Sequence, residues 1–285
     1  MEKADGVKMA SNPPWLETKR DNFSEHIFVG GNKLMLDILK NNKEQLGINR
    51  AVSFDKVLNK TEEILQSAAS ITLLNQTHTK NTLNVELKLT SETGHKLPTS
   101  FPSRRAFIHF TVYDGNDNIL FESGKVNADG SIVGANSDTD RRQYEPHYDT
   151  ITSENQVQIY EAIMQNTDSE LTYTLLRAAS YKKDNRILPK GFDKNSVPSD
   201  IAVLGDALGD DDFIGGSDTI TYSIDTTAFA TTPSRVEIEL LYQTLSYPFA
   251  QDLFSDKTSQ SESFRGMFES SNVKTSTIAT HAFSM

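Results

Sequence analysis

The chain of 285 residues contains no cysteine. This absence excludes disulfides, thiolate zinc sites, iron–sulfur clusters, thiol nucleophiles and the C-x-x-C-H attachment of c-type haem. The sequence also lacks any run of about 18 apolar residues, so we expect no membrane-spanning helix. No apolar secretion segment follows Met1, and any export must therefore be inferred from other features.

Basic residues are few relative to acidic ones, 28 against 39, and the formal net charge is -11. On average such a chain repels nucleic-acid phosphate, so we expect no nucleic-acid partner. The acidic balance favours solubility and is compatible with divalent cations. Hydrophobic residues make up 36% of the sequence, which predicts a packed core.

Two helices are predicted near the N-terminus. Apolar residues recur at nearly helical spacing over about 32–46 and again over about 54–69, and Ser53 is a candidate N-cap for the second helix. An antiparallel helical hairpin is the expected arrangement. We therefore predict an N-terminal region, residues 1–69, that consists of an extended segment and this hairpin.

From about residue 70 the pattern changes to period two, which is typical of half-buried strands. Leu83–Leu89 alternates apolar and polar residues without a break. Residues 106–113 and 119–123 flank an Asp-Gly turn and predict a β-hairpin. Further strands are predicted at 156–163, 171–179, 218–225 and 235–245.

These elements predict a mostly β fold of the α+β kind. We expect an antiparallel β-sandwich over residues 70–285, preceded by the helical hairpin and followed by short C-terminal helices near 248–254 and 259–269. No strand alternates with a long helix, which disfavours a parallel α/β fold. Long polar loops, which usually carry function or pack against something, are expected at 124–155, 180–217 and 246–275.

The most unusual stretch is Thr93–Arg105, TGHKLPTSFPSRR, in which two prolines and a glycine predict a rigid connection between strands. His95 and the adjacent Arg104 and Arg105 are candidate ligands for an anion such as a carboxylate. The alternative is a structural corner, with His95 bonded to the backbone and one arginine paired with an acidic loop.

Residues 206–218 offer five carboxylates, and clustered hard oxygens suit Ca²⁺. The spacing does not match an EF-hand loop, so a solvated acidic loop is the alternative. His147 is a candidate metal ligand or catalytic base, although no second histidine stands at ligand spacing. The candidate Ca²⁺ ligands are Asp206, Asp210, Asp211 and Asp212.

The motifs of common enzyme classes do not occur in the sequence. It has no G-x-S-x-G, no P-loop, no G-x-G-x-x-G and no H-E-x-x-H. We therefore predict no enzymatic activity. A hydrolase that uses His95 or His147 with a neighbouring aspartate is the remaining catalytic alternative.

Seven short blocks resemble, in the same order, the haem-free C-terminal part of a group of bacterial multihaem cytochromes c. Thr93–Arg105 is similar to the family stretch T-G-H-K-L-P-T-G-F-P-x-R-R, with Ser100 in place of the preferred glycine. The blocks lie within residues 20–245 or so. The other six are 26–32, 118–124, 146–147, 157–161, 183–192 and 216–222.

The resemblance implies a periplasmic or extracellular module that packs on or docks the haem-bearing N-terminal part, or a partner cytochrome. The haem c groups of that parent protein would carry the electrons, and Met1–Lys3 would follow a haem motif. His26 would be a distal haem ligand in the intact protein. A haem propionate becomes the expected anion at His95, Arg104 and Arg105.

The alternative is a free-standing cell-surface sandwich that binds carbohydrate or Ca²⁺. The acidic loop 206–218 and the single Trp15, together with nine tyrosines, support this interpretation. An exposed apolar patch around residues 13–36 is the feature that would favour the cytochrome module instead.

Overall fold

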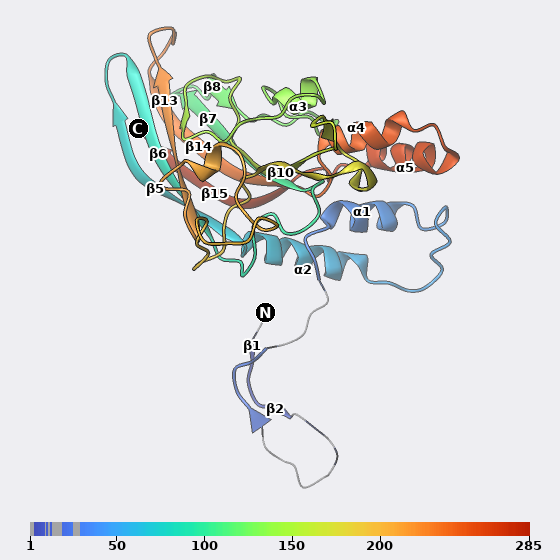
Figure 1. The fold of residues 1–285 in the computed structure, drawn as a ribbon. Helices are drawn as coiled ribbons and strands as arrows, with labels where there is room; N and C mark the ends of the chain where they lie inside the picture. Colours follow the sequence, from blue (N-terminus) through green and yellow to red (C-terminus); the bar gives the residue numbers. More distant parts are fainter. Residues whose placement is uncertain (1–2, 9, 11, 13–18, 25–28) are drawn as a thin grey trace. The chain divides into compact units, whose positions relative to one another are not determined.

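The computed structural model describes all residues except 1–2, 9, 11, 13–18 and 25–28 (Figure 1). The chain divides into two compact units, residues 1–30 and residues 31–285. His26, Trp15 and much of the predicted apolar patch at 13–36 lie outside the described residues.

The smaller unit contains two short antiparallel strand pairs. Gly6 and Asn22 adopt positive φ values, +66° and +56°, beside these pairs. The backbone N–H of Gly6 donates to the Asp21 carboxylate, and the backbone N–H of Asn22 donates to the Asp5 carboxylate. These two hydrogen bonds link the turn at Gly6 to the turn at Asn22. The strands are β1 (Lys3–Ala4), β2 (Val7–Lys8), β3 (Lys19–Arg20) and β4 (Phe23–Ser24).

The larger unit is mostly β, with antiparallel sheets and several helices (Figure 1). A seven-stranded sheet runs in the order β11-β10-β7-β14-β15, with β12 also paired to β10 and β8 to β7. Its strands are β7 (Arg105–Asp114), β8 (Ile119–Ser123), β10 (Ile159–Gln165), β11 (Leu171–Thr172), β12 (Ser180–Asp184), β14 (Pro233–Gln243) and β15 (Ser276–Ser284).

A four-stranded sheet runs in the order β5-β6-β13-β9. Its long strands pair antiparallel, and the short β9 joins β13 in parallel. The members are β5 (Ala69–His78), β6 (Thr82–Ser91), β9 (Thr150–Ile151) and β13 (Ser217–Asp225).

Side chains from both sheets contribute to one apolar core. Along β6 every second residue is buried, as the alternation of Leu83–Leu89 predicts. Phe110 of β7 stacks on Tyr222 of β13 with ring centroids 3.8 Å apart. Full burial of each such side chain stabilises the fold by about 1.5–3 kcal/mol, so the two sheets hold each other in place.

Three of the five described helices contribute to a second apolar cluster. Leu34 and Ile38 of α1 pack with Ala250 and Phe254 of α4 and with Phe268 of α5. The helices are α1 (Lys33–Asn41), α2 (Phe54–Gln66), α3 (Asn136–Thr139), α4 (Tyr247–Ser255) and α5 (Ser259–Ser270).

Two ion pairs join α1 to α2. Lys33 pairs with Glu62 and Lys40 pairs with Asp55, so the two helix directions oppose each other. The end of α2 also reaches the main core through Leu65. The domain boundary at residue 69 stays a prediction.

The predicted strand at 171–179 is wrong. Only Leu171–Thr172 form a strand, β11, and a short 3₁₀ turn, η1 (Leu175–Arg177), follows. The Thr172 hydroxyl accepts a hydrogen bond from the Thr174 backbone N–H, at 3.3 Å, and so competes with strand pairing. No strand range was predicted for β5, for β9 inside the expected loop 124–155, for β12 inside the expected loop 180–217, for β15 at the C-terminus or for the short β1–β4.

Candidate functional site

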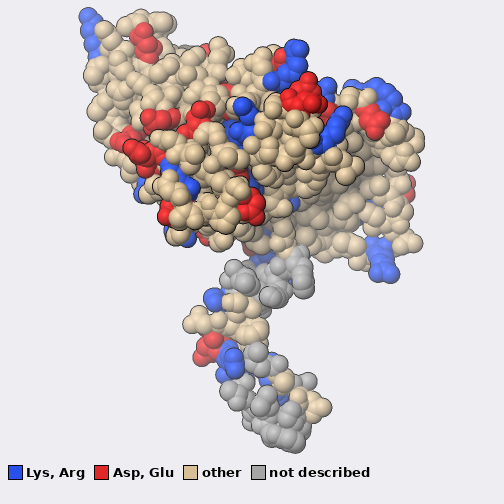
Figure 2. All heavy atoms as spheres, viewed as in Figure 1, with Lys and Arg blue, Asp and Glu red and all other residues tan. Residues whose placement is uncertain are grey.

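The candidate site is an acidic hollow of about 540 Å³ beside the starts of β9 and β13. On the visible face of the larger unit, acidic side chains lie in several separate groups with basic ones between them (Figure 2). The described lining of the hollow differs, because it has five aspartates and no lysine or arginine. It consists of His147, Asp149, Asp206, Gly209, Asp210, Asp211 and Asp212.

The short parallel pairing of β9 with β13 assembles this hollow. Asp149 directly precedes β9, and its carbonyl accepts a hydrogen bond from the Thr221 N–H of β13 at 2.9 Å. Asp210–Asp212 belong to the loop that leads into β13. Two loops far apart in the sequence therefore face each other across the hollow.

His147 is held at the inner side of the hollow by two side-chain amides. Its Nδ1 lies 2.9 Å from Gln158 Nε2 and 2.9 Å from Asn185 Nδ2. The orientation of each amide is fixed, because Gln158 Oε1 accepts from the Tyr148 N–H and Asn185 Oδ1 accepts from the Glu161 N–H. Nδ1 therefore accepts both hydrogen bonds and carries no proton.

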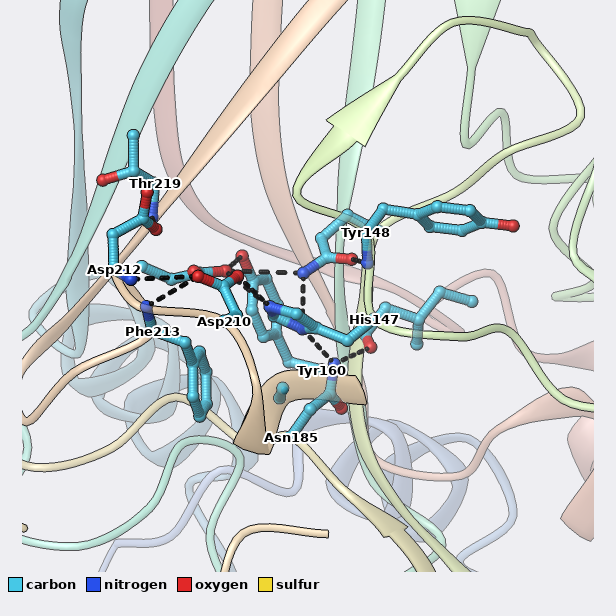
Figure 3. A network of polar contacts seen from close by, with 12 residues as sticks. His147, Tyr148, Tyr160, Asn185, Asp210, Asp212, Phe213 and Thr219 are labelled. Atoms are coloured by element: carbon cyan, nitrogen blue, oxygen red, sulfur yellow. Dashed lines mark hydrogen bonds and ion pairs between the residues drawn. The ribbon is translucent and has the colours of Figure 1, made fainter. Parts of the chain in front are cut away.

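The ring proton of His147 consequently lies on Nε2. Nε2 is 3.1 Å from Asp210 Oδ2, so the imidazole donates to that carboxylate (Figure 3). Phe213 packs edge-on against the ring with centroids 5.0 Å apart. His147 is thus a buried, fully engaged side chain, 8% exposed.

Asp210 is the centre of the polar network. Its Oδ1 accepts from the backbone N–H groups of Asp212 and Phe213, at 3.0 and 3.2 Å. Lys194 donates to the backbone carbonyl of Asp210. Partial burial would raise the pKa of the Asp210 carboxyl, but the hydrogen bond from His147 and those from the backbone hold it below its usual range.

Asp218 lies behind Asp210 at a core-facing position of β13. It is fully buried, and the Tyr160 hydroxyl donates to its Oδ2 at 2.6 Å. Its Oδ1 has no hydrogen-bond partner among the described residues. Burial raises the pKa of the Asp218 carboxyl to about 7, and the nearby charges of Asp210 and Asp212 add to the effect.

The four aspartates predicted as Ca²⁺ ligands all line the hollow. Two groups of side chains have ligand atoms within 4.8 Å of one another: Asp149 with Asp210 and Asp212, and His147 with Asp210 and Asp218. Asp211 and Asp206 belong to neither group. The metal role of the predicted residues stays a prediction.

Asp149 and Asp218 were missed as candidate ligands. A sequence signal for Asp218 exists, because it falls in phase with Ile220, Tyr222 and Ile224 and so occupies a core-facing position of a strand. Asp149 has no comparable signal, since only the pairing of β9 with β13 brings it to the hollow.

The Thr93–Arg105 block lies elsewhere, against residues 183–192. Leu97 and Ile187 exchange two backbone hydrogen bonds of 2.8 Å each. His95 is exposed, with Nδ1 at 3.0 Å from the Lys96 carbonyl oxygen, and Arg104 donates to the Thr99 carbonyl at 3.2 Å. The blocks 93–105 and 183–192, which both resemble the cytochrome family, therefore form one corner of the fold.

Arg105 is buried in a bidentate ion pair. Its two terminal nitrogens each donate to Asp138 at 2.7 Å, and Nε donates to Gln243 at 2.7 Å. The Arg105 side chain is 0% exposed and that of Asp138 is 2% exposed. The Arg105 guanidinium is thus paired inside the protein with a carboxylate of the loop 124–155. That Arg105 binds a haem propionate stays a prediction.

Ser100, where the resembling family prefers glycine, adopts a φ of +54°. This left-handed conformation costs a residue with a Cβ about 1–2 kcal/mol, while glycine adds freedom to the unfolded chain worth about 0.4–1 kcal/mol. Ser100→Gly should therefore raise the free energy of unfolding by about 0.5–1 kcal/mol in urea titrations. Ser70→Gly, at an exposed position of β5, should lower it, and stabilisation by both changes would contradict the explanation.

The chain cannot attach haem c, because it supplies no cysteine. No described helix has both the length and the hydropathy needed to cross a bilayer.

No protein-family model and no curated protein matches the chain. Among solved structures, a penta-heme cytochrome c552 from Thermochromatium tepidum is similar, with a TM-score of 0.47 and 14% sequence identity. The match covers 79% of this chain and 41% of that cytochrome, so the chain spans less than half of its length. A likeness this weak establishes neither a common fold nor a common function.

Proposed function

We propose that this chain is the haem-free C-terminal module of an exported multihaem c-type cytochrome, built as a two-sheet sandwich and located in the periplasm or outside the cell. The module packs on or docks the haem-bearing part and supports its electron transfer by packing and solvent exclusion. The redox step itself belongs to the haem-bearing polypeptide, because this chain has no cysteine for haem c.

The proposal rests on the positions of the blocks that resemble that family. Four of them, 146–147, 157–161, 183–192 and 216–222, supply one connected network of polar side chains. Matches that meet in one buried network are expected of a shared folding unit rather than of scattered short similarities. The network residues are His147, Gln158, Tyr160, Asn185 and Asp218.

The docking surface in this proposal is an apolar groove of about 610 Å³. Leu176 stands at its edge with 98% of its surface exposed, and Phe101, 44% exposed, belongs to the Thr93–Arg105 block. Contiguous exposed apolar side chains mark interaction surfaces in soluble proteins. The groove also includes Leu175, Phe249 and Leu253.

Leu176→Asp should weaken association with the haem-bearing polypeptide at least tenfold. The partner to use is the haem-bearing part of the proposed cytochrome, or a partner cytochrome, that carries C-x-x-C-H motifs. A charge buried in an apolar contact costs more than about 1.4 kcal/mol, which corresponds to a tenfold change in Kd. The Kd is measured by calorimetric titration, and circular dichroism checks that the variant is folded.

Ile119→Asp is the matched control. Ile119 is 48% exposed on β8 and does not line the groove, so this variant should bind the partner as the wild type does. Equal affinity of Leu176→Asp and the wild type would remove the groove from the proposal. Equal weakening by both variants would show a general effect of charge.

A further inference from the structure

Three carboxylates from two loops converge at the acidic hollow. Oxygen atoms of Asp149, Asp210 and Asp212 lie within 4.8 Å of one another, and Asp149 and Asp212 are exposed to the hollow. Asp210 also belongs to the group formed with His147 and Asp218, so the cluster extends inward from the surface. Like charges this close repel unless a cation or a proton compensates them.

A second observation comes from the buried end of this cluster. Asp218 has 0% exposure, and its Oδ1 has no hydrogen-bond partner among the described residues. Buried carboxylate oxygens in native proteins are almost always paired, so an unpaired one calls for a further ligand. The Asp218 carboxylate belongs to the ligand group with His147 and Asp210, and Asp210 also lines the hollow.

The geometry of His147 decides which cation suits the cluster. A histidine that binds a transition metal through one nitrogen donates a proton from the other. In His147, Nδ1 accepts from Gln158 and Asn185, and Nε2 carries the proton that is given to Asp210. Neither nitrogen is free as a ligand, so the donors that remain are hard carboxylate oxygens.

We propose that the hollow binds one Ca²⁺ through Asp149, Asp210 and Asp212, with the buried Asp218 carboxyl group behind them. Carboxylates from two loops at an open hollow match the irregular, oxygen-rich coordination of Ca²⁺, in which water can complete the shell. This site goes beyond the proposed cytochrome module and requires no haem-bearing partner.

Calorimetric titration of CaCl₂ into EDTA-dialysed chain tests the site. Wild-type protein should give a saturable heat with a stoichiometry of about one, and its melting temperature should rise with CaCl₂. The double variant Asp149→Asn/Asp212→Asn should lose at least tenfold in affinity. Asp218→Asn, which keeps the side-chain size and the Tyr160 hydrogen bond, should also bind Ca²⁺ more weakly.

Asp211→Asn is the matched control. Asp211 lines the same hollow, and its substitution removes one carboxyl group, as Asp218→Asn does. It belongs to neither ligand group, so Asp211→Asn should bind Ca²⁺ as tightly as the wild type does. Flat heats with an unchanged melting temperature would overturn the proposal. It would also be overturned by an equal loss in Asp211→Asn and the double variant, or by tighter binding of Zn²⁺ than of Ca²⁺.

Discussion

Asp138→Ala is expected to lower the free energy of unfolding by about 3–5 kcal/mol, since it leaves a buried guanidinium without its partner. Arg105 is 0% exposed and forms two 2.7 Å hydrogen bonds with the Asp138 carboxylate. Arginine does not lose its proton in proteins, so the charge cannot be relieved by titration. Urea unfolding followed by circular dichroism measures the loss.

Asp140→Ala is the control for this variant. Asp140 lies on the same loop but pairs with Arg142, whose side chain is 89% exposed, and it should change stability little. The double variant Arg105→Met/Asp138→Leu should recover most of the stability, because it removes both charges together. A small loss in Asp138→Ala would contradict the claim that Asp138 is the partner on which the buried Arg105 charge depends.

Glu161→Gln is expected to cost about 3 kcal/mol near neutral pH, and this cost should shrink as pH rises. Lys183 is fully buried, and its Nζ lies 3.2 Å from Glu161 Oε1 and donates to the Ile159 carbonyl at 2.9 Å. Burial lowers the pKa of the Lys183 amine. The Glu161 charge and hydrogen bond oppose this most, and the charges of Glu145 and Asp206 oppose it less. Without the Glu161 charge the pKa falls further.

The sign of the pH effect follows from proton binding. In the folded Glu161→Gln variant, Lys183 holds its proton less tightly than in the folded wild type, whereas the unfolded states hold it equally. The stability of the variant relative to the wild type therefore rises with pH. Unfolding at about pH 7 and about pH 10 measures the difference. The loss in Asp138→Ala should stay constant over this window, and a constant loss in Glu161→Gln would contradict the assignment of Lys183.

The long strands β6 and β13 could be predicted from the sequence because one face of each is buried. β6 and β13 alternate apolar and polar residues, and β7 has an Asp-Gly turn after it, so local pattern was sufficient. The strand prediction failed at residues 171–179 and at β15 for a different reason. Leu175 and Leu176 are apolar but exposed, and β15 is built largely of small and polar residues whose position depends on pairing with β14.

The candidate site could be predicted only in part. Asp210–Asp212 were identified because they are neighbours in the sequence. Asp149 and His147 reach the same hollow through the two-residue pairing of β9 with β13, which no periodicity reveals. The sequence left open whether Arg105 binds an anion or pairs with an acidic loop, and it did not identify the partner, because Asp138 lies 33 positions away.

The most direct test of the cytochrome-module proposal is sedimentation velocity of the chain mixed with the haem-bearing C-x-x-C-H part of the proposed cytochrome, followed at the haem absorbance. The haem-bearing polypeptide should sediment faster in the mixture, at the rate expected of a one-to-one complex. Haem that sediments at the same rate with and without the chain, at micromolar concentrations of both, would contradict the proposal.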